Sequence, residues 1–273
     1  PERLERHAPM VRRLTQQRMD RFIDVGRVDL VAGMFWEIPQ IVALKFLGVA
    51  EEDIENLKSF SVAHTVNTWG RPEPGEQIAV ADAVGKFWQA SGRILEKMKA
   101  DPDAPGWMQT SIRQHREHPD IVTESYLHSM MMAILVAAHE TTANASANAF
   151  RMLLEQPDVW RELVENPSLI PNAAEECLRH SGPIAAWRRK ATAETVLGGV
   201  LIPKDAKLLI ATASANHDER KFENPDRLDL YRDNSAEHLN FGYGSHQCMG
   251  KNIGRMEMRI FLDEFSRRLP HLR

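Results

Sequence analysis

The chain has 273 residues, of which 43% are hydrophobic and 26% charged, and its net charge of −4 at pH 7 gives no reason to expect nucleic-acid binding. Two cysteines, Cys177 and Cys248, exclude a disulfide framework and are typical of a reducing compartment. The longest apolar run, Met130 to Ala138, is too short to span a bilayer, so we expect a cytoplasmic protein with no membrane span.

Helical patterns dominate the first two thirds of the chain, beginning with an amphipathic, charge-rich helix over 1–25. The longest pattern runs over about 120–154 and stops before Pro157. Its segment from Met130 to Ala138 is apolar on every side, which predicts a helix buried through the middle of the protein. Further helices are predicted at about 35–47, 51–68, 76–100, 106–117, 158–165 and 169–180.

The pattern changes after residue 183, where short β signals replace the long helices. An irregular stretch over 218–240 precedes a last helix at about 251–267. We therefore expect a single domain, 1–273, that is mainly α with a small β portion. Strands are predicted over 186–189, 195–197, 200–202 and 207–211, with Gly198-Gly199 as a turn.

One cysteine stands on a loop punctuated by glycines, in the stretch His238-Leu-Asn-Phe-Gly-Tyr-Gly-Ser-His-Gln-Cys-Met-Gly250. Because Gly242 and Gly244 have no side chain, the loop can turn sharply and approach a flat ligand closely. A helix that opens after Gly250 directs backbone N–H groups toward Cys248, which stabilises a thiolate. A single thiolate outside any disulfide or four-ligand cluster suits the axial position of a haem iron.

Three other interpretations of this loop remain open. A zinc site formed by His238, His246 and Cys248 lacks a second ligand pair at metal-ligand spacing. A catalytic cysteine paired with His246 is disfavoured because side chains two residues apart diverge on most backbones. A purely structural buried cysteine is the usual fate of a lone Cys, but it does not account for the extra glycines and the flanking Phe241.

The long apolar helix carries a second signal, Ala137-Ala-His-Glu-Thr-Thr142. Burying Glu140 is costly unless the protein needs a carboxyl group there. The simpler alternative is that Thr141 and Thr142 bond back to carbonyls four residues earlier and bend the helix. We expect His139 to be an ordinary packed or solvent-facing helix residue.

The loop pattern Phe-Gly-x-Gly-x-His-x-Cys-x-Gly, residues 241–250, resembles the haem-thiolate loop of the cytochrome P450 family. The resemblance implies that Cys248 ligates the iron of haem b and that the rest of the motif contacts the haem. Arg189 stands where the family binds a haem propionate, and His246 is the second candidate for that role. The expected cofactor-binding residues are Arg189, Phe241, Gly242, His246, Cys248 and Gly250.

The helical segment resembles the family's oxygen-activation motif, in which an acid–alcohol pair manages protons for bound dioxygen. By position, Glu140 would admit protons and Thr141 would hold the activated dioxygen. Ala138 departs from the family pattern, which usually has Gly, and we expect its methyl group to narrow the space for dioxygen and substrate.

The segment Glu176-Cys-Leu-Arg179 resembles the family's Glu-x-x-Arg pair, although such a pair alone is usually a surface contact. The family's ion-pair network has a third member, which by position is Arg227. The following Leu228 is a mild departure from the usual Phe. We expect the three charged residues to clamp the irregular segment behind the loop that carries Cys248, residues 238–250 (the Cys loop).

The resemblance covers the whole chain but implies a P450-like fold that lacks its N-terminal part. Segments 178–182, 214–220 and 267–271 are similar to self-sufficient bacterial members, in which a flavin and iron–sulfur reductase is fused after the haem domain. FMN and a 2Fe-2S cluster are therefore expected only in a missing or partner reductase module. Lys251, Arg255 and Arg259, spaced four apart, form either an ordinary wet face or a docking surface for an acidic electron donor.

The family implies a monooxygenase that inserts one oxygen atom from dioxygen into a small apolar organic substrate. Electrons would come from a fused reductase domain or a ferredoxin-type donor. A peroxide-driven peroxygenase and a non-catalytic haem sensor or electron-transfer protein are the alternatives. Residues expected either to line the substrate pocket or to be core packing are Met131, Leu135, Ala138, Ile184, Ala185 and Ala186.

Overall fold

The computed structural model describes residues 2–58 and 60–273 and divides the chain into two compact units. Unit 1 comprises Pro1–Ala143 and unit 2 comprises Asn144–Arg273, so the boundary falls inside the long helix α8, Glu124–Leu154. The change from helical to β signals at residue 184 is therefore a change of secondary structure within unit 2, and it does not coincide with the boundary between the units. Pro1 and Ser59, both expected to be helical, lie outside the described residues.

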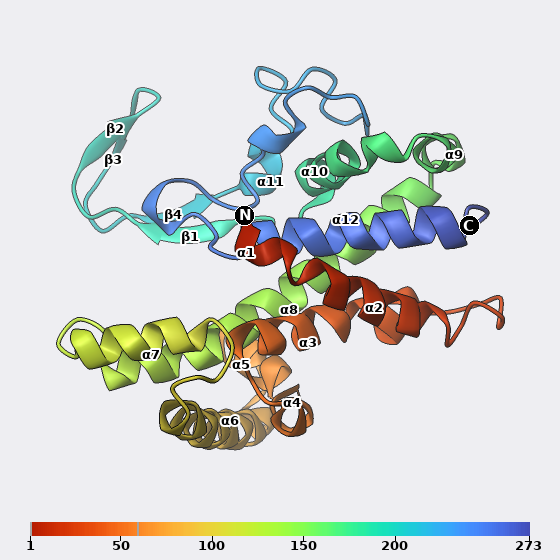
Figure 1. The fold of residues 1–273 in the computed structure, drawn as a ribbon. Helices are drawn as coiled ribbons and strands as arrows, with labels where there is room; N and C mark the ends of the chain where they lie inside the picture. The colour runs from red at the N-terminus through yellow and green to blue at the C-terminus, as the bar shows by residue number, and fades with distance from the viewer. Residues whose placement is uncertain (1, 59) are drawn as a thin grey trace. The chain divides into compact units, whose positions relative to one another are not determined.

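In the described residues of unit 1, every regular element is a helix (Figure 1). The pattern expected over 1–25 forms two helices, and the pattern over 51–68 also divides in two. A π-helical turn, which the sequence did not predict, precedes α3. The elements are α1 Glu2–Glu5, α2 Ala8–Met19, η1 Val31–Phe35, α3 Ile38–Leu47, α4 Glu51–Lys58, α5 Ser61–Trp69, α6 Pro74–Ala100, α7 Met108–Glu117 and the first part of α8.

Local chemistry explains where two of these helices begin and end. Helix α6 begins after Glu73, which forms a capping box with Glu76, and Pro74 occupies the first turn, where its missing N–H costs nothing. Helix α3 ends at Gly48, whose φ of 96° lies in the left-handed region. A side chain at Gly48 would collide with the carbonyl of Pro105, so glycine is required where the end of α3 contacts the backbone at residue 105.

The core of unit 1 joins α3, α4, α6, α7 and α8 through aliphatic and aromatic side chains. Helix α8 contributes side chains from successive turns, as expected for a helix that is apolar on several faces. Fully buried members include Leu44, Leu47, Phe87, Met108, Ile112, Leu127, Met131 and Leu135.

Unit 2 combines helices with two small antiparallel ladders, β1–β4 and β2–β3 (Figure 1). Trp187 pairs with Ile210 in the first ladder, and Thr195 pairs with Ile202 in the second, around glycines with positive φ at 198 and 199. The helices are the end of α8, α9 Pro157–Glu165, η2 Pro167–Leu169, α10 Ile170–Ser181, α11 Thr212–Ala215, η3 Ser235–Glu237, η4 Gly244–His246 and α12 Lys251–Arg268, and the strands are β1 Trp187–Lys190, β2 Thr195–Leu197, β3 Val200–Ile202 and β4 Lys207–Ile210.

The expected fold class, mainly α with a small β portion, is confirmed. Within the described part of the chain, no helix combines the length and the apolar character that a membrane crossing requires.

Candidate functional site

The Cys loop lies between η3 and α12, and its only regular element is the short turn η4. The backbone N–H of Cys248 donates to the carbonyl of Phe241 at 2.8 Å, which closes the loop on itself. Gly242 and Gly244 have φ of 68° and 78°, a conformation that L side chains rarely adopt. The glycines predicted to turn the chain sharply do so at these two positions.

The loop offers an open backbone surface beside an exposed thiol. Cys248 is exposed, and a Cβ placed on Gly244 would meet no atom within 4 Å. A Cβ on Gly242 would meet only the carbonyl oxygen of His246, at 3.9 Å. A Cβ on Gly250 would lie 3.9 Å from the Cys248 sulfur, which is an ordinary contact. This combination of open backbone and a single thiol fits a flat ligand whose metal accepts one sulfur donor.

The alternatives to a haem-type site fit the structure poorly. In residues 2–58 and 60–273, no group of three or more His, Cys, Asp and Glu side chains could hold a metal ion, which argues against zinc. His238 is buried and turned toward Glu175, with Nε2 3.5 Å from a carboxylate oxygen, whereas His246 is exposed. Because Cys248 is exposed, it is not a structural core cysteine either.

The acid–alcohol segment lies on α8, in unit 1. The hydroxyl of Thr141 donates to the carbonyl of Ala137 at 2.6 Å, the back-bond that the simpler interpretation predicted. Glu140 is half-buried, and burial raises the pKa of its carboxyl group despite an opposing hydrogen bond from Thr65. His139 is buried and contacts the carbonyl of Trp36 at 2.6 Å, so it is a packed residue.

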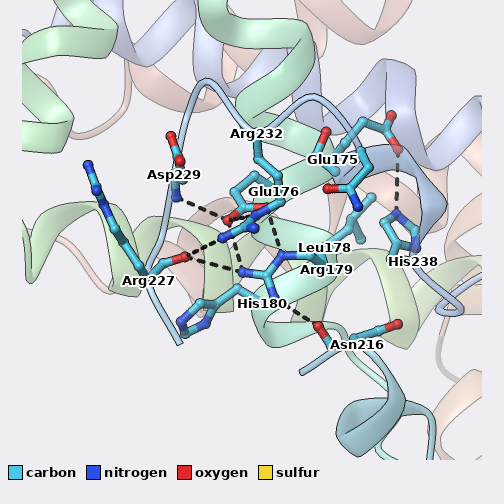
Figure 2. A network of polar contacts seen from close by, with 12 residues as sticks. Glu175, Glu176, Leu178, Arg179, His180, Asn216, Arg227, Asp229, Arg232 and His238 are labelled. Carbon is cyan, nitrogen blue, oxygen red and sulfur yellow. Dashed lines mark hydrogen bonds and ion pairs between the residues drawn. The ribbon is translucent and has the colours of Figure 1, made fainter. Parts of the chain in front are cut away.

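Glu176 is the centre of a buried ion-pair network (Figure 2). Arg179 donates to both of its carboxylate oxygens, at 2.8 and 2.9 Å, and Arg232 donates to both at 3.0 and 3.1 Å. The backbone N–H of Asp229 adds a further bond of 3.0 Å. Both carboxylate oxygens thus accept hydrogen bonds from two charged partners, and such partners are the condition for tolerating buried charge.

The prediction that Arg227 is the third charged member of this network is wrong. Its side chain is exposed and points away from Glu176 (Figure 2), and only its carbonyl takes part. That carbonyl accepts bonds from Arg179 at 3.3 Å and from Arg232 at 3.2 Å. Arg232, which lies five residues further along the irregular segment, reaches the carboxylate instead. Both arginines bond to backbone carbonyls of this segment, so the network fixes its path.

A second buried carboxylate, Glu175, was missed by the sequence analysis. Glu175 is 5% exposed, and its carboxylate lies within ion-pair distance of the side chains of Arg255, Arg259 and His238. Burial opposes the ionisation of Glu175, but the polar groups of His238 and Arg255 that face its carboxylate outweigh burial and lower the pKa of Glu175 to about 2. Two of the three cations on the expected basic stripe, Arg255 and Arg259, therefore form ion pairs with Glu175. The third, Lys251, donates a hydrogen bond to Gln247 at 2.5 Å.

Arg189 lies on β1 with its side chain exposed. Its guanidinium group donates to the carbonyl of Arg188 at 2.8 Å and lies 5.9 Å from the ring centre of Trp187. Lys190 forms a surface ion pair with Asp205 at 2.7 Å. The free edge of the Arg189 guanidinium can therefore bind an anionic group.

The expected pocket residues separate into two sets. Met131 and Leu135 belong to the core of unit 1, so of the two interpretations left open for them the structure favours core packing. Ala138 is half-buried on the same helix. Ile184 and Ala186 are half-buried and Ala185 is exposed in unit 2, where the hydroxyl of Thr212 donates to the carbonyls of residues 184 and 185.

Comparisons with known proteins agree with the motifs. The family model described as Cytochrome P450 matches residues 165–269. Cytochrome P450 CYP107DY1 of Priestia megaterium is 31% identical over 100% of this chain and 65% of its own length. Nocardicin C N-oxygenase of Nocardia uniformis subsp. tsuyamanensis is 32% identical over 99% of this chain and 67% of its own length. The chain thus spans about two thirds of the length of these curated relatives.

Solved structures give the same assignment at higher identity. The CYP116B5 haem domain of Acinetobacter radioresistens is 60% identical, with a TM-score of 0.94 over 99% of this chain and 65% of that chain. An intact type IV self-sufficient cytochrome P450 monooxygenase is 65% identical, with a TM-score of 0.96 over 99% of this chain and 35% of that chain. The likeness extends over nearly every residue described above, and the chain belongs to the cytochrome P450 family.

Proposed function

We propose that this chain is part of a haem-thiolate monooxygenase that transfers one oxygen atom from dioxygen to a small apolar organic substrate. The observation that carries the proposal is the exposed Cys248 on a loop whose backbone stays open at Gly242 and Gly244. When bound there, haem supplies the activation of dioxygen and the oxidation of a C–H bond or heteroatom.

The residues of unit 2 would hold the cofactor. Cys248 would provide the thiolate ligand, and the N-terminus of α12 would stabilise its negative charge. Phe241 would pack against the macrocycle, while Arg189 and His246 would bind the carboxylates of the haem by charge and hydrogen bonding. The open backbone at the two loop glycines supports this arrangement, because a flat molecule needs close approach there.

The residues of α8 would manage protons. Because its pKa is raised, Glu140 takes up and releases a proton closer to neutral pH than an ordinary glutamate does. The bond from Thr141 to Ala137 fixes the direction of the hydroxyl hydrogen and leaves the oxygen lone pairs free to accept a bond. Glu140 and Thr141 would thus deliver and position protons for dioxygen chemistry, whereas a peroxide-driven enzyme does not need this relay.

The proposed partners are a small apolar substrate, dioxygen and a source of electrons. The 65% identity to an intact self-sufficient monooxygenase supports a fused reductase with FMN and a 2Fe-2S cluster, and a ferredoxin-type donor is the alternative. Lys251, with Arg255 and Arg259, would then face the donor. The cytoplasmic location expected from composition stays a prediction.

The first test is the absorption spectrum of the reduced, carbon-monoxide-bound protein, recorded for the wild type and for Cys248→Ser. We expect a far-red Soret band that only the wild type shows, because only a thiolate ligand produces it. A histidine-like band in the wild type would contradict thiolate ligation, and the absence of a haem band would contradict haem binding by this chain. The stoichiometry of haem per chain provides an independent measure.

Thr141→Ala is expected to uncouple turnover, so that electrons are released as hydrogen peroxide instead of entering product. Product formed per reducing equivalent should fall about tenfold or more, because a positioned proton-transfer group speeds its own step by about 10²–10⁴-fold. The measurement compares hydrogen peroxide, product and NAD(P)H consumed with a competent reductase. Thr141→Ser, which keeps the hydroxyl, is the matched control and should stay near the wild type. Full coupling in Thr141→Ala would exclude the proton role.

A further inference from the structure

The Cys loop is connected to α10 through an aromatic ring and a buried carboxylate. We propose that Arg255, held by Glu175, is a positioning residue that fixes the Cys248 loop through Phe241. The consequence for haem binding rests on the function proposed above, whereas the fixing of the loop does not. We call Glu175, Arg255, His238 and Phe241 the Glu175 cluster.

The guanidinium group of Arg255 is held in one plane by Glu175. Its Nε donates to the two carboxylate oxygens at 2.8 and 3.0 Å, and its Nη2 donates to Oε2 at 2.8 Å. Such a two-pronged arrangement orients a guanidinium far more strictly than a single contact does. Because Glu175 is buried on α10, this orientation is anchored to a rigid element and shielded from solvent.

The oriented guanidinium group lies over the ring of Phe241, with Cζ 4.7 Å from the ring centre. This distance is within the range of a cation–π interaction, which strengthens as the pair loses water. The carbonyl of Phe241 accepts the N–H of Cys248 at 2.8 Å. A displacement of Phe241 therefore moves the backbone that carries the thiol.

His238 holds Phe241 from a second direction. Its ring centre lies 5.4 Å from that of Phe241. Its Nδ1 accepts the backbone N–H of Asn240 at 3.2 Å, so the ring proton resides on Nε2, which faces a Glu175 oxygen at 3.5 Å. Both neighbours of the Phe241 ring thus lie against the same carboxylate, Arg255 through hydrogen bonds and His238 at 3.5 Å, which restricts the movement of the ring.

Arg259 provides a matched control for Arg255. It reaches the same carboxylate through one bond of 3.3 Å, and it stands one helical turn further along α12, away from the loop. Its removal takes one positive charge away from the same carboxylate and leaves the Arg255–Phe241 contact in place. A pure charge effect should therefore appear in both variants, whereas positioning should appear only at Arg255.

The direct test is hydrogen exchange of the Cys248 amide in the full chain without haem. Arg255→Gln and Arg255→Lys are both expected to exchange about tenfold faster than the wild type, the scale of one lost, partly desolvated cation–π contact. Lys keeps the charge but has no planar fork, so it separates positioning from charge. Arg259→Gln should stay within about twofold. Unchanged exchange in both Arg255 variants would overturn the proposal.

Two further measurements link the positioning role to the cofactor. Transfer of haem to apomyoglobin should be faster in Arg255→Lys than in the wild type, and its reduced carbon-monoxide spectrum should contain more of the histidine-like band. Phe241→Leu should give a similar loss, and the double variant should be no worse, because both changes remove one contact. Strictly additive effects would contradict action through Phe241. If the wild type gives no thiolate-type spectrum, the proposed function fails, and hydrogen exchange still decides the positioning.

Discussion

Glu176→Ala is expected to lower the free energy of unfolding by about 3–5 kcal/mol, because it strands two buried guanidinium groups. Arg179 and Arg232 are both directed at this carboxylate, and their side chains are almost fully shielded from solvent. Since the same arginines fix the segment that precedes the Cys loop, the purified variant should contain little or no haem. Urea unfolding and the ratio of haem to protein measure the two effects.

The matched controls are the two arginines of the irregular segment. Arg232→Ala should resemble Glu176→Ala, because it leaves the carboxylate with one charged partner. Arg227→Ala keeps the carbonyl that both network arginines use and removes only an exposed side chain, so its effect should stay within about 0.5 kcal/mol. Equal losses at Arg227 and Arg232 would refute the assignment of Arg232. Normal haem content in Glu176→Ala would show that the network is dispensable.

Glu257→Gln is expected to stabilise the protein increasingly as the pH rises. Glu257 is 2% exposed on α12, and burial raises the pKa of its carboxyl group to about 8. The folded state therefore keeps the proton between the unfolded pKa of 4.5 and about 8, while the unfolded state releases it. Folding then becomes less favourable with rising pH, and the loss is complete above about 8.

The measurement is the free energy of unfolding of both proteins at pH 5 and pH 8. The advantage of Glu257→Gln should be larger at pH 8 by about 3 kcal/mol, since one pKa unit corresponds to about 1.4 kcal/mol. Glutamine has no proton to lose in this range, and it keeps the shape of the side chain. An advantage that is the same at both values of pH would show that Glu257 is not protonated in the folded protein.

Periodic patterns with clear stops were predicted well from sequence. Helices α6, α8 and α9 begin within a few residues of their expected positions, because proline and capping residues mark their ends. The turns of the Cys loop were also predictable, since only glycine readily adopts the positive φ found at positions 242 and 244. In both cases the determining interactions are local in the chain.

Features that depend on tertiary packing were not predictable. Nothing in the sequence distinguishes Arg227 from Arg232, because the path of the irregular segment decides which one reaches Glu176. The role of Glu175 was missed because its burial arises only when α10 and α12 pack together. For Met131 the sequence left pocket lining and core packing both open, since a periodic apolar face does not reveal whether a core or a ligand covers it.

The two cysteines of this chain differ in their accessibility to oxidants. Cys177 is 1% exposed, and burial raises the pKa of its thiol to about 12, so it resists both oxidants and alkylating agents. Cys248 is exposed. Disulfide-linked dimers and sulfenic acid should therefore form at Cys248 only, and handling under reducing conditions decides whether a preparation keeps the thiol that the proposed haem ligation requires.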